Sequence, residues 1–88
     1  MPLVSSFYGI LIYIYRERGT QHNVPHVHAM YNEYDIAIDF EGNILAGTMP
    51  KKQQKLVEAW VLIHSEELKA TWKAYTDFGE LIKIKGLE

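Results

Sequence analysis

Alternating hydrophobic and polar positions predict β-strands in the first half of the chain. Two runs with period-two alternation, residues 26–31 and 34–40, are separated by two residues and predict a β-hairpin. Asn32 suits the tight turn between them, because asparagine tolerates the positive φ that primed turns require. Residues 44–50 predict a further strand of this antiparallel arrangement, which ends at Pro50.

An earlier run of β-branched and aromatic residues, 7–15, predicts another strand. Apolar side chains occupy both its odd-numbered and its even-numbered positions, so both faces of this strand are expected to be covered. Gly9 within the run indicates a bulge or the close approach of another backbone. The polar stretch 16–23 predicts a loop, and Pro25 keeps the backbone of the residue before it extended.

The second half of the chain changes to helical periodicity. After Pro50, apolar-stripe positions recur every three or four residues, at Val57, Trp60, Val61, His64, Leu68, Trp72 and Tyr75. We expect two successive helices, about 50–63 and 66–77, with Gly79 as the C-terminal stop and 81–85 as an edge strand. The pattern therefore predicts an α+β fold in a single domain, residues 1–88. An antiparallel β-sheet of three to five strands is packed by one or two C-terminal amphipathic helices.

The register of the predicted hairpin assigns its side chains to two faces. With a two-residue turn, His28 lies opposite Ala37 and His26 lies opposite Asp39. The core face then consists of Val27, Ala29, Tyr31, Tyr34, Ile36, Ile38 and Phe40. The other face, away from the main core, carries His26, His28, Met30, Asp35, Ala37 and Asp39. A slip of one residue would exchange the two faces.

Composition narrows the class of protein. The chain has 88 residues, no cysteine, a net charge of -2 and a pI of about 6.1. Disulfides and thiolate metal sites are excluded, and the pI argues against a broadly basic nucleic-acid binder. No apolar stretch approaches the ~20 residues of a membrane span, and no basic segment precedes the first apolar run, so we expect a cytoplasmic protein without a signal peptide. Six tyrosines and two tryptophans in so small a domain predict a homodimer or a complex with a partner protein.

Three of the four histidines, His22, His26 and His28, lie close together in the sequence and allow three interpretations. The first is a half-exposed sheet face on which imidazoles pair with Asp39. The second is acid–base catalysis without a metal: one imidazole accepts a proton, another donates one and Asp39 orients a ring, as in RNA cleavage through the 2′-hydroxyl. The third is a divalent metal site formed by His26, His28 and Asp39, with His22 as an additional ligand.

The remaining candidate residues have simpler default roles. His64 lies in the apolar helical stripe and is expected to be a satisfied core histidine. Arg16 and Arg18 flank the histidine loop, and Lys51 opens the first helix. The simplest interpretation is that these side chains are exposed to solvent. The more specific hypothesis is that they contact the phosphates of an RNA or nucleotide substrate.

These residues also carry a resemblance. The chain resembles the bacterial family called domain of unknown function 4160, whose hallmark is a His-x-x-Pro-His-Phe-His-Ala run. The run is matched at His22, Pro25, His26, His28 and Ala29. Val27 replaces the phenylalanine of the hallmark, a conservative change on the core face. The resemblance covers nearly the whole chain, with further matches at Glu33, Tyr34, Pro50, Trp60, His64, Glu67, Leu68 and Trp72.

The resemblance implies a genomic setting and a function. Genes of this family often stand beside a gene for another small domain, called domain of unknown function 2442, and the pair is similar to a type II toxin–antitoxin module. The histidine protein is then the toxin, its partner is a cognate antitoxin encoded next to it, and RNA or a nucleotide is the expected substrate at His26 and His28. The acidic pI opposes this expectation, since small ribonuclease toxins tend to be basic. A non-catalytic module that binds and regulates a partner, and a small metal-binding protein, remain the alternatives.

Overall fold

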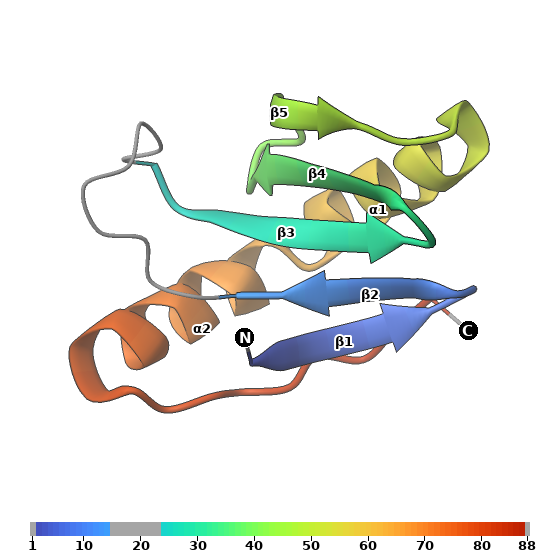
Figure 1. Ribbon diagram of the computed structural model, residues 1–88. Coiled ribbons are helices and arrows are strands. Elements are labelled where there is room, and N and C mark those ends of the chain that lie inside the picture. The colour runs from blue at the N-terminus through green and yellow to red at the C-terminus, as the bar shows by residue number, and fades with distance from the viewer. Residues whose placement is uncertain (1, 15–23, 88) are drawn as a thin grey trace.

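The computed structural model of the protein describes residues 2–14 and 24–87, which form an antiparallel sheet with two helices on one side of it (Figure 1). Neighbouring strands in the sheet follow sequence order, β1-β2-β3-β4-β5. The strands are β1 (Leu3–Phe7), β2 (Ile10–Tyr13), β3 (His26–Tyr31), β4 (Tyr34–Asp39) and β5 (Ile44–Thr48), and the helices are α1 (Lys51–Ile63) and α2 (Ser65–Phe78). This architecture confirms the predicted α+β class.

The two successive helices begin and end close to the predicted positions. α1 starts directly after Pro50, and α2 ends at Gly79, whose φ of 71° lies in the left-handed region that favours glycine. The helices meet at His64, where φ is -107° and ψ is 23°, so the chain bends there instead of continuing as one helix. Within the described ranges, neither helix is long and apolar enough to cross a membrane.

The prediction of one continuous strand over residues 7–15 is wrong. Tyr8 and Gly9 have φ values of 49° and 77° and form the turn at which the chain reverses from β1 to β2. Positive φ at both central residues is typical of the tight turns that join antiparallel strands. The two-residue turn pairs Phe7 with Ile10, and β2 buries Ile10 and Ile12. Leu11, at the alternate position of β2, is 38% exposed, so the second face of this strand is not covered, contrary to the sequence prediction.

The edge strand predicted at residues 81–85 does not form either. This segment runs beside β1, and Ile84 N donates a hydrogen bond to Val4 O at 2.9 Å. The indole Nε1 of Trp60 donates to Lys85 O, also at 2.9 Å. The Trp60 side chain thus occupies a carbonyl oxygen that would otherwise accept a hydrogen bond within a β-sheet. The segment therefore packs beside β1 without forming a strand.

The register of the β3–β4 hairpin is the one the sequence predicts. Asn32 has a φ of 54° in the two-residue turn, His28 pairs with Ala37, and His26 pairs with Asp39. Tyr34 departs from the predicted core face because it flanks the turn, and it is exposed. Between the sheet and the helices lies the core, which includes Phe7, Ile12, Val27, Ala29, Ile36, Ile38, Val57, Trp60, Val61 and Leu68.

Gly47 occupies a position in β5 that no other residue fits. Its φ is 85°, and a Cβ added there would lie 2.2 Å from the carbonyl oxygen of Asp35 on the neighbouring strand. Gly79 also has a positive φ, but a Cβ added there would meet nothing within 4 Å. Substitution of Gly79 therefore introduces backbone strain alone, whereas substitution of Gly47 introduces both backbone strain and a steric clash.

We expect Gly47→Ala to lower the free energy of unfolding by about 3 kcal/mol, through the combined backbone strain and overpacking. Gly79→Ala should cost only about 1 kcal/mol, because it adds the conformational penalty alone. Urea denaturation followed by tryptophan fluorescence measures both values. Equal losses for the two variants would contradict the close approach of Gly47 to β4.

Candidate functional site

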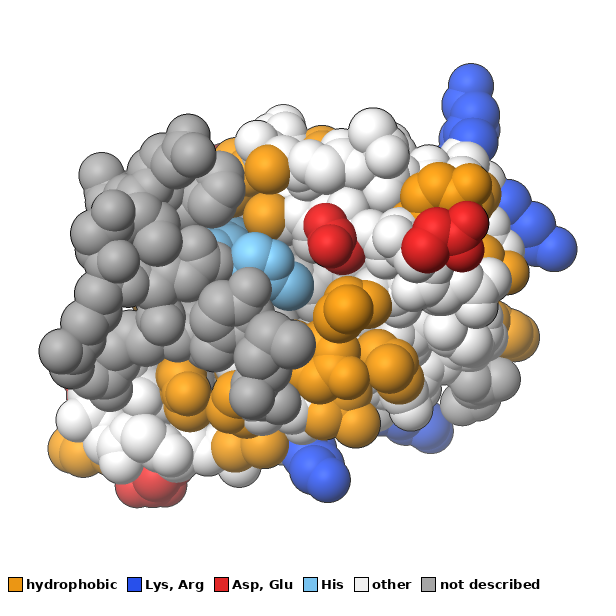
Figure 2. Space-filling view, in the orientation of Figure 1, with side chains coloured by type: hydrophobic (Ala, Val, Ile, Leu, Met, Phe, Trp, Pro, Cys, Tyr) orange, Lys and Arg blue, Asp and Glu red, His pale blue; other side chains and the backbone are white. Residues whose placement is uncertain are grey.

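The sheet has an open face, on the side away from the helices, and this face carries the candidate site. Strand alternation and the observed pairing assign its side chains, which are Leu3, Ser6, Leu11, Tyr13, His28, Met30, Asp35, Ala37, Ala46 and Thr48. We call this set of residues the open face. Figure 2 views the molecule from this side and shows apolar, acidic and histidine side chains together over the sheet.

His28 lies in the middle of a row that crosses the sheet. Tyr13 of β2 is paired with it on one side and Ala37 of β4 on the other. Cβ atoms of directly opposed residues are about 4.5–5.5 Å apart, so the two side chains leave neighbouring positions on the same face of the sheet. Tyr13 thus adds a phenol to the row that contains the half-buried His28. Sequence reasoning missed Tyr13, because reading residues 7–15 as one strand left its sheet partner unknown.

His26 is buried, whereas strand alternation predicts a ring away from the core. Only 1% of the residue is exposed, and its ring centroid lies 5.1 Å from that of His28 and 5.6 Å from that of Trp72 in α2. The last described pair between β2 and β3 is Tyr13 with His28. Beyond this pair, the Trp72 indole reaches the His26 ring from the helix layer, which explains the burial.

A backbone hydrogen bond fixes the orientation of the His26 ring. Its Nδ1 lies 2.7 Å from the carbonyl oxygen of Val24. A carbonyl oxygen can only accept, so Nδ1 carries a proton and donates it, and Nε2 is the acceptor nitrogen of the neutral ring. Pro25, between the two residues, restricts the backbone to the extended form that makes this bond. His26 therefore acts as a rigid support beside His28.

Asp39 stabilises a turn and does not orient an imidazole. One carboxylate oxygen accepts hydrogen bonds from Glu41 N at 2.9 Å and Asn43 N at 2.8 Å, and the other accepts from Asn43 Nδ2 at 3.1 Å. Backbone register places Asp39 opposite His26 as predicted. The expected hydrogen bond to an imidazole does not form, because the carboxylate turns towards the β4–β5 connection.

The turn also changes the acidity of Asp39. Partial burial acts to raise its pKa, but the hydrogen bonds from Asn43 and Glu41 outweigh this and lower the pKa below its ordinary value of 3.8. Hydrogen bonds to a carboxylate favour its charged form. Asp39 is therefore a fixed negative charge at the end of β4.

The predicted metal site lacks its carboxylate ligand, because the Asp39 carboxylate is hydrogen-bonded within the turn. Among the described residues, no group of three or more His, Asp or Glu side chains is arranged to hold a metal ion. Asp39, which was expected to complete a set with His26 and His28, is used by the turn. His22, the expected additional ligand, lies outside the described residues.

The other predicted site residues lie away from the histidine pair or outside the described ranges. Arg16 and Arg18 are outside these ranges, and Lys51 is exposed at the start of α1, on the helix side of the sheet. His64 is satisfied as expected: its Nδ1 lies 2.5 Å from Glu67 Oε1, and its ring centroid lies 5.4 Å from that of Trp60. Lys51, the described residue predicted to contact phosphate, is therefore not on the open face.

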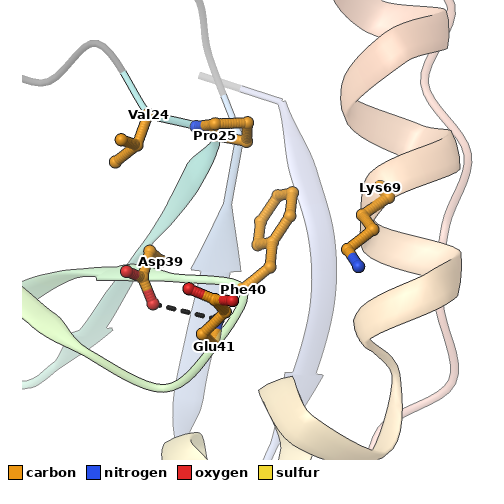
Figure 3. A pocket seen from close by; sticks show the side chains of 6 residues that line it. All are labelled: Val24, Pro25, Asp39, Phe40, Glu41 and Lys69. Carbon is orange, nitrogen blue, oxygen red and sulfur yellow. Dashed lines mark hydrogen bonds between the residues drawn. The ribbon is translucent and has the colours of Figure 1, made fainter.

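A pocket of about 350 Å³ lies where β4 ends, next to the residues that precede β3 (Figure 3). Its lining combines apolar and charged side chains: Val24, Pro25, Asp39, Phe40, Glu41 and Lys69. The Phe40 ring lies in the middle of the view, and the Lys69 side chain enters from α2. Phe40 also contacts Trp72, with ring centroids 6.2 Å apart, so the pocket and the buried His26 share one aromatic neighbour.

Fold and site together define a small α+β protein with a buried and a half-buried histidine at the end of an open sheet face. The family model of Domain of unknown function (DUF4160) matches residues 9–73, and the chain belongs to this family. Comparison with curated proteins and with solved structures finds no match. The family match includes the histidine pair and both flanking strands, whereas β1 and the segment that packs beside it lie outside the match.

Different burial predicts different stability effects for the two histidines. His26→Ala should lower the free energy of unfolding by about 2–4 kcal/mol, because it leaves a cavity against Trp72 and an unpaired Val24 carbonyl. His28→Ala should cost less than His26→Ala, since the His28 ring is only half-buried. Urea midpoints of the purified variants test this difference, and equal losses would contradict the burial of His26.

The lowered pKa of Asp39 predicts a pH-dependent contribution to stability. Because the pKa is lower in the folded state than in the unfolded chain, this contribution is present above the unfolded-state value of about 3.9. It is lost as the pH falls through the folded-state pKa. Asp39→Asn should therefore cost about 1 kcal/mol at pH 7, and its difference from wild type should shrink below pH ~4. Urea denaturation at several pH values measures this.

Asn43→Ala provides a second variant for the same test, because it removes the side-chain donor to Asp39 but keeps the carboxylate. It should show a smaller pH-dependent loss in the same direction. A difference between Asp39→Asn and wild type that stays constant from pH 7 to pH ~3 would show that the turn does not lower the pKa of Asp39.

Proposed function

We propose that the protein is the toxin component of a type II toxin–antitoxin module and that the open face around His28 is its working surface. The observation that carries the proposal is the half-buried His28 imidazole, which lies beside the buried His26 ring and is paired in the sheet with Tyr13. Membership of the family that the sequence resembles supports the genomic setting. The proposal includes a cytoplasmic location and a cognate antitoxin encoded next to the protein.

The chemistry that suits this arrangement is proton transfer on RNA or a nucleotide. Imidazole side chains accept and donate protons readily at neutral pH. In the proposed reaction, His28 accepts the proton of a 2′-hydroxyl, the 2′-oxygen attacks phosphorus, and the bond to the leaving oxygen breaks. In the same proposal Tyr13, which is paired with His28 in the sheet, donates a proton to that oxygen. His26 is a positioning residue, because burial keeps it from the substrate.

A second candidate function is a non-catalytic module that binds and regulates a partner. The observation that favours it is the charge of the open face, which among the described residues carries Asp35 but no Lys or Arg. RNA binding draws most of its affinity from cations that contact phosphates. In the toxin proposal this role falls to Arg16 and Arg18, whereas a binding module does not need them.

The toxin proposal predicts that growth inhibition depends on His28. Expression of the wild type without its partner should slow growth and degrade RNA or deplete nucleotides. His28→Ala and His28→Gln should lower the rate of the proposed reaction by a factor of about 10²–10⁴ and abolish the growth inhibition. His64→Ala is a matched control, because it removes a histidine from the helix layer and should leave inhibition intact.

Growth curves, total RNA and nucleotide pools are compared after induction, with soluble protein levels measured in parallel. The proposal is wrong if the wild type does not slow growth, or if folded His28 variants slow it equally. Growth inhibition that survives His28→Ala without any loss of RNA or nucleotides would favour the binding module.

A further inference from the structure

We infer that the open face is the docking surface for a partner protein whose contacting segment combines apolar side chains with Lys or Arg. The inference rests on the proposed function in one respect, namely that the partner is the antitoxin. The contacting groups lie in two adjacent cross-strand rows. One row contains Leu11, Met30, Asp35 and Thr48, and the other contains Tyr13, His28, Ala37 and Ala46.

The apolar part of this surface lies over β2 and β3. Leu11 is 38% exposed, and its partner Met30 is half-buried. Towards β5, the two rows end in the short, exposed side chains of Ala46 and Thr48, whereas Ala37 of β4 is buried. A partner segment can therefore approach the backbone of β5 while it packs against Met30 and His28. Contacts with Met suit partner surfaces because its side chain is unbranched and adapts in shape.

The charge of the surface selects a basic partner. Asp35, Asp39 and Glu41 follow one another along β4 and the turn after it. Lys side chains lie at the rim of the view in Figure 2 and not over the middle of the sheet. Opposite charges across an interface accelerate encounter and suppress wrong partners.

The pocket beside Phe40 offers an anchor for one basic side chain of the partner. A Lys or Arg side chain can lay its aliphatic part on Phe40 and Pro25 and direct its charged end to Glu41. Asp39 adds a second carboxylate to this lining. Lys69 also lines the pocket and would repel a basic side chain of the partner. Its Nζ lies 3.4 Å from Glu66 Oε2, and this ion pair partly offsets the repulsion. A partner on the open face covers His28, which belongs to one of the two rows, and thereby blocks the proposed chemistry.

The test uses the full chain and the purified product of the adjacent gene as the probe. Asp35→Lys and Met30→Glu change the charge and the apolar part of the open face. Glu80→Lys and Ile63→Glu are matched controls, because they make the same kinds of change at exposed positions outside the open face. Dissociation constants are measured by calorimetry at low and high NaCl, and urea midpoints confirm that each variant is folded.

The inference predicts a dissociation constant at least about tenfold higher for both open-face variants and near wild type for both controls. Wild-type affinity should fall as NaCl rises, and Asp35→Asn should reduce that dependence. Equal affinity for the open-face variants would overturn the inference and leave the toxin proposal standing, since growth inhibition by the free protein is measured separately. Absence of a complex would also overturn it.

A nucleic-acid outcome is tested on the same variants with a fluorescently labelled single-stranded RNA. If the RNA binds the wild type and Met30→Glu weakens this binding, while the partner binds both proteins equally and does not compete with the RNA, the open face is an RNA surface only and the inference is wrong. Failure of wild type to inhibit growth, together with open-face-dependent partner binding, would instead refute the toxin proposal and keep the docking surface.

Discussion

The pairing register of β3 with β4 is the constraint on which the rest of the structure depends. The two-residue turn at Asn32 directs Val27 and Ile38 to the helices and His28 to the open face. Since side chains alternate with period two, a slip of one residue would place the imidazole in the core and expose the apolar residues. The positive φ of Asn32 and the burial of one face favour the same register, so local geometry and packing agree.

The end of the sheet shows how the helix layer reaches the site. The His26 ring lies between His28 on the open face and Trp72 of α2. Trp72 in turn contacts Phe40, which lines the pocket. This chain of ring contacts joins the half-buried imidazole to the core and fixes its position through packing. A support of this kind suits a site that needs one oriented imidazole, because the supporting ring loses little freedom when a partner or substrate arrives.

The carboxylates of β4 have two different roles although they belong to one strand. Asp39 is held by three hydrogen bonds and closes the β4–β5 turn, which keeps it charged. Asp35 is exposed between Met30 and Thr48 on the open face. One carboxylate thus closes a turn, and the other leaves its negative charge on the sheet surface. This division explains why an acidic residue opposite a histidine in register is not necessarily its hydrogen-bond partner.

Period-two and period-3.6 patterns were sufficient to predict the α+β class, both helices and the faces of the central hairpin. These features are local: a two-residue turn couples 26–31 to 34–39, and one apolar stripe marks the helices. The burial of His26, the place of Tyr13 beside His28 and the turn made by Asp39 were not predicted. Each depends on a contact between segments far apart in the chain, or on a choice between competing hydrogen-bond partners. Trp72 covers His26 across more than forty residues of sequence, and such contacts arise only when the helices pack on the sheet.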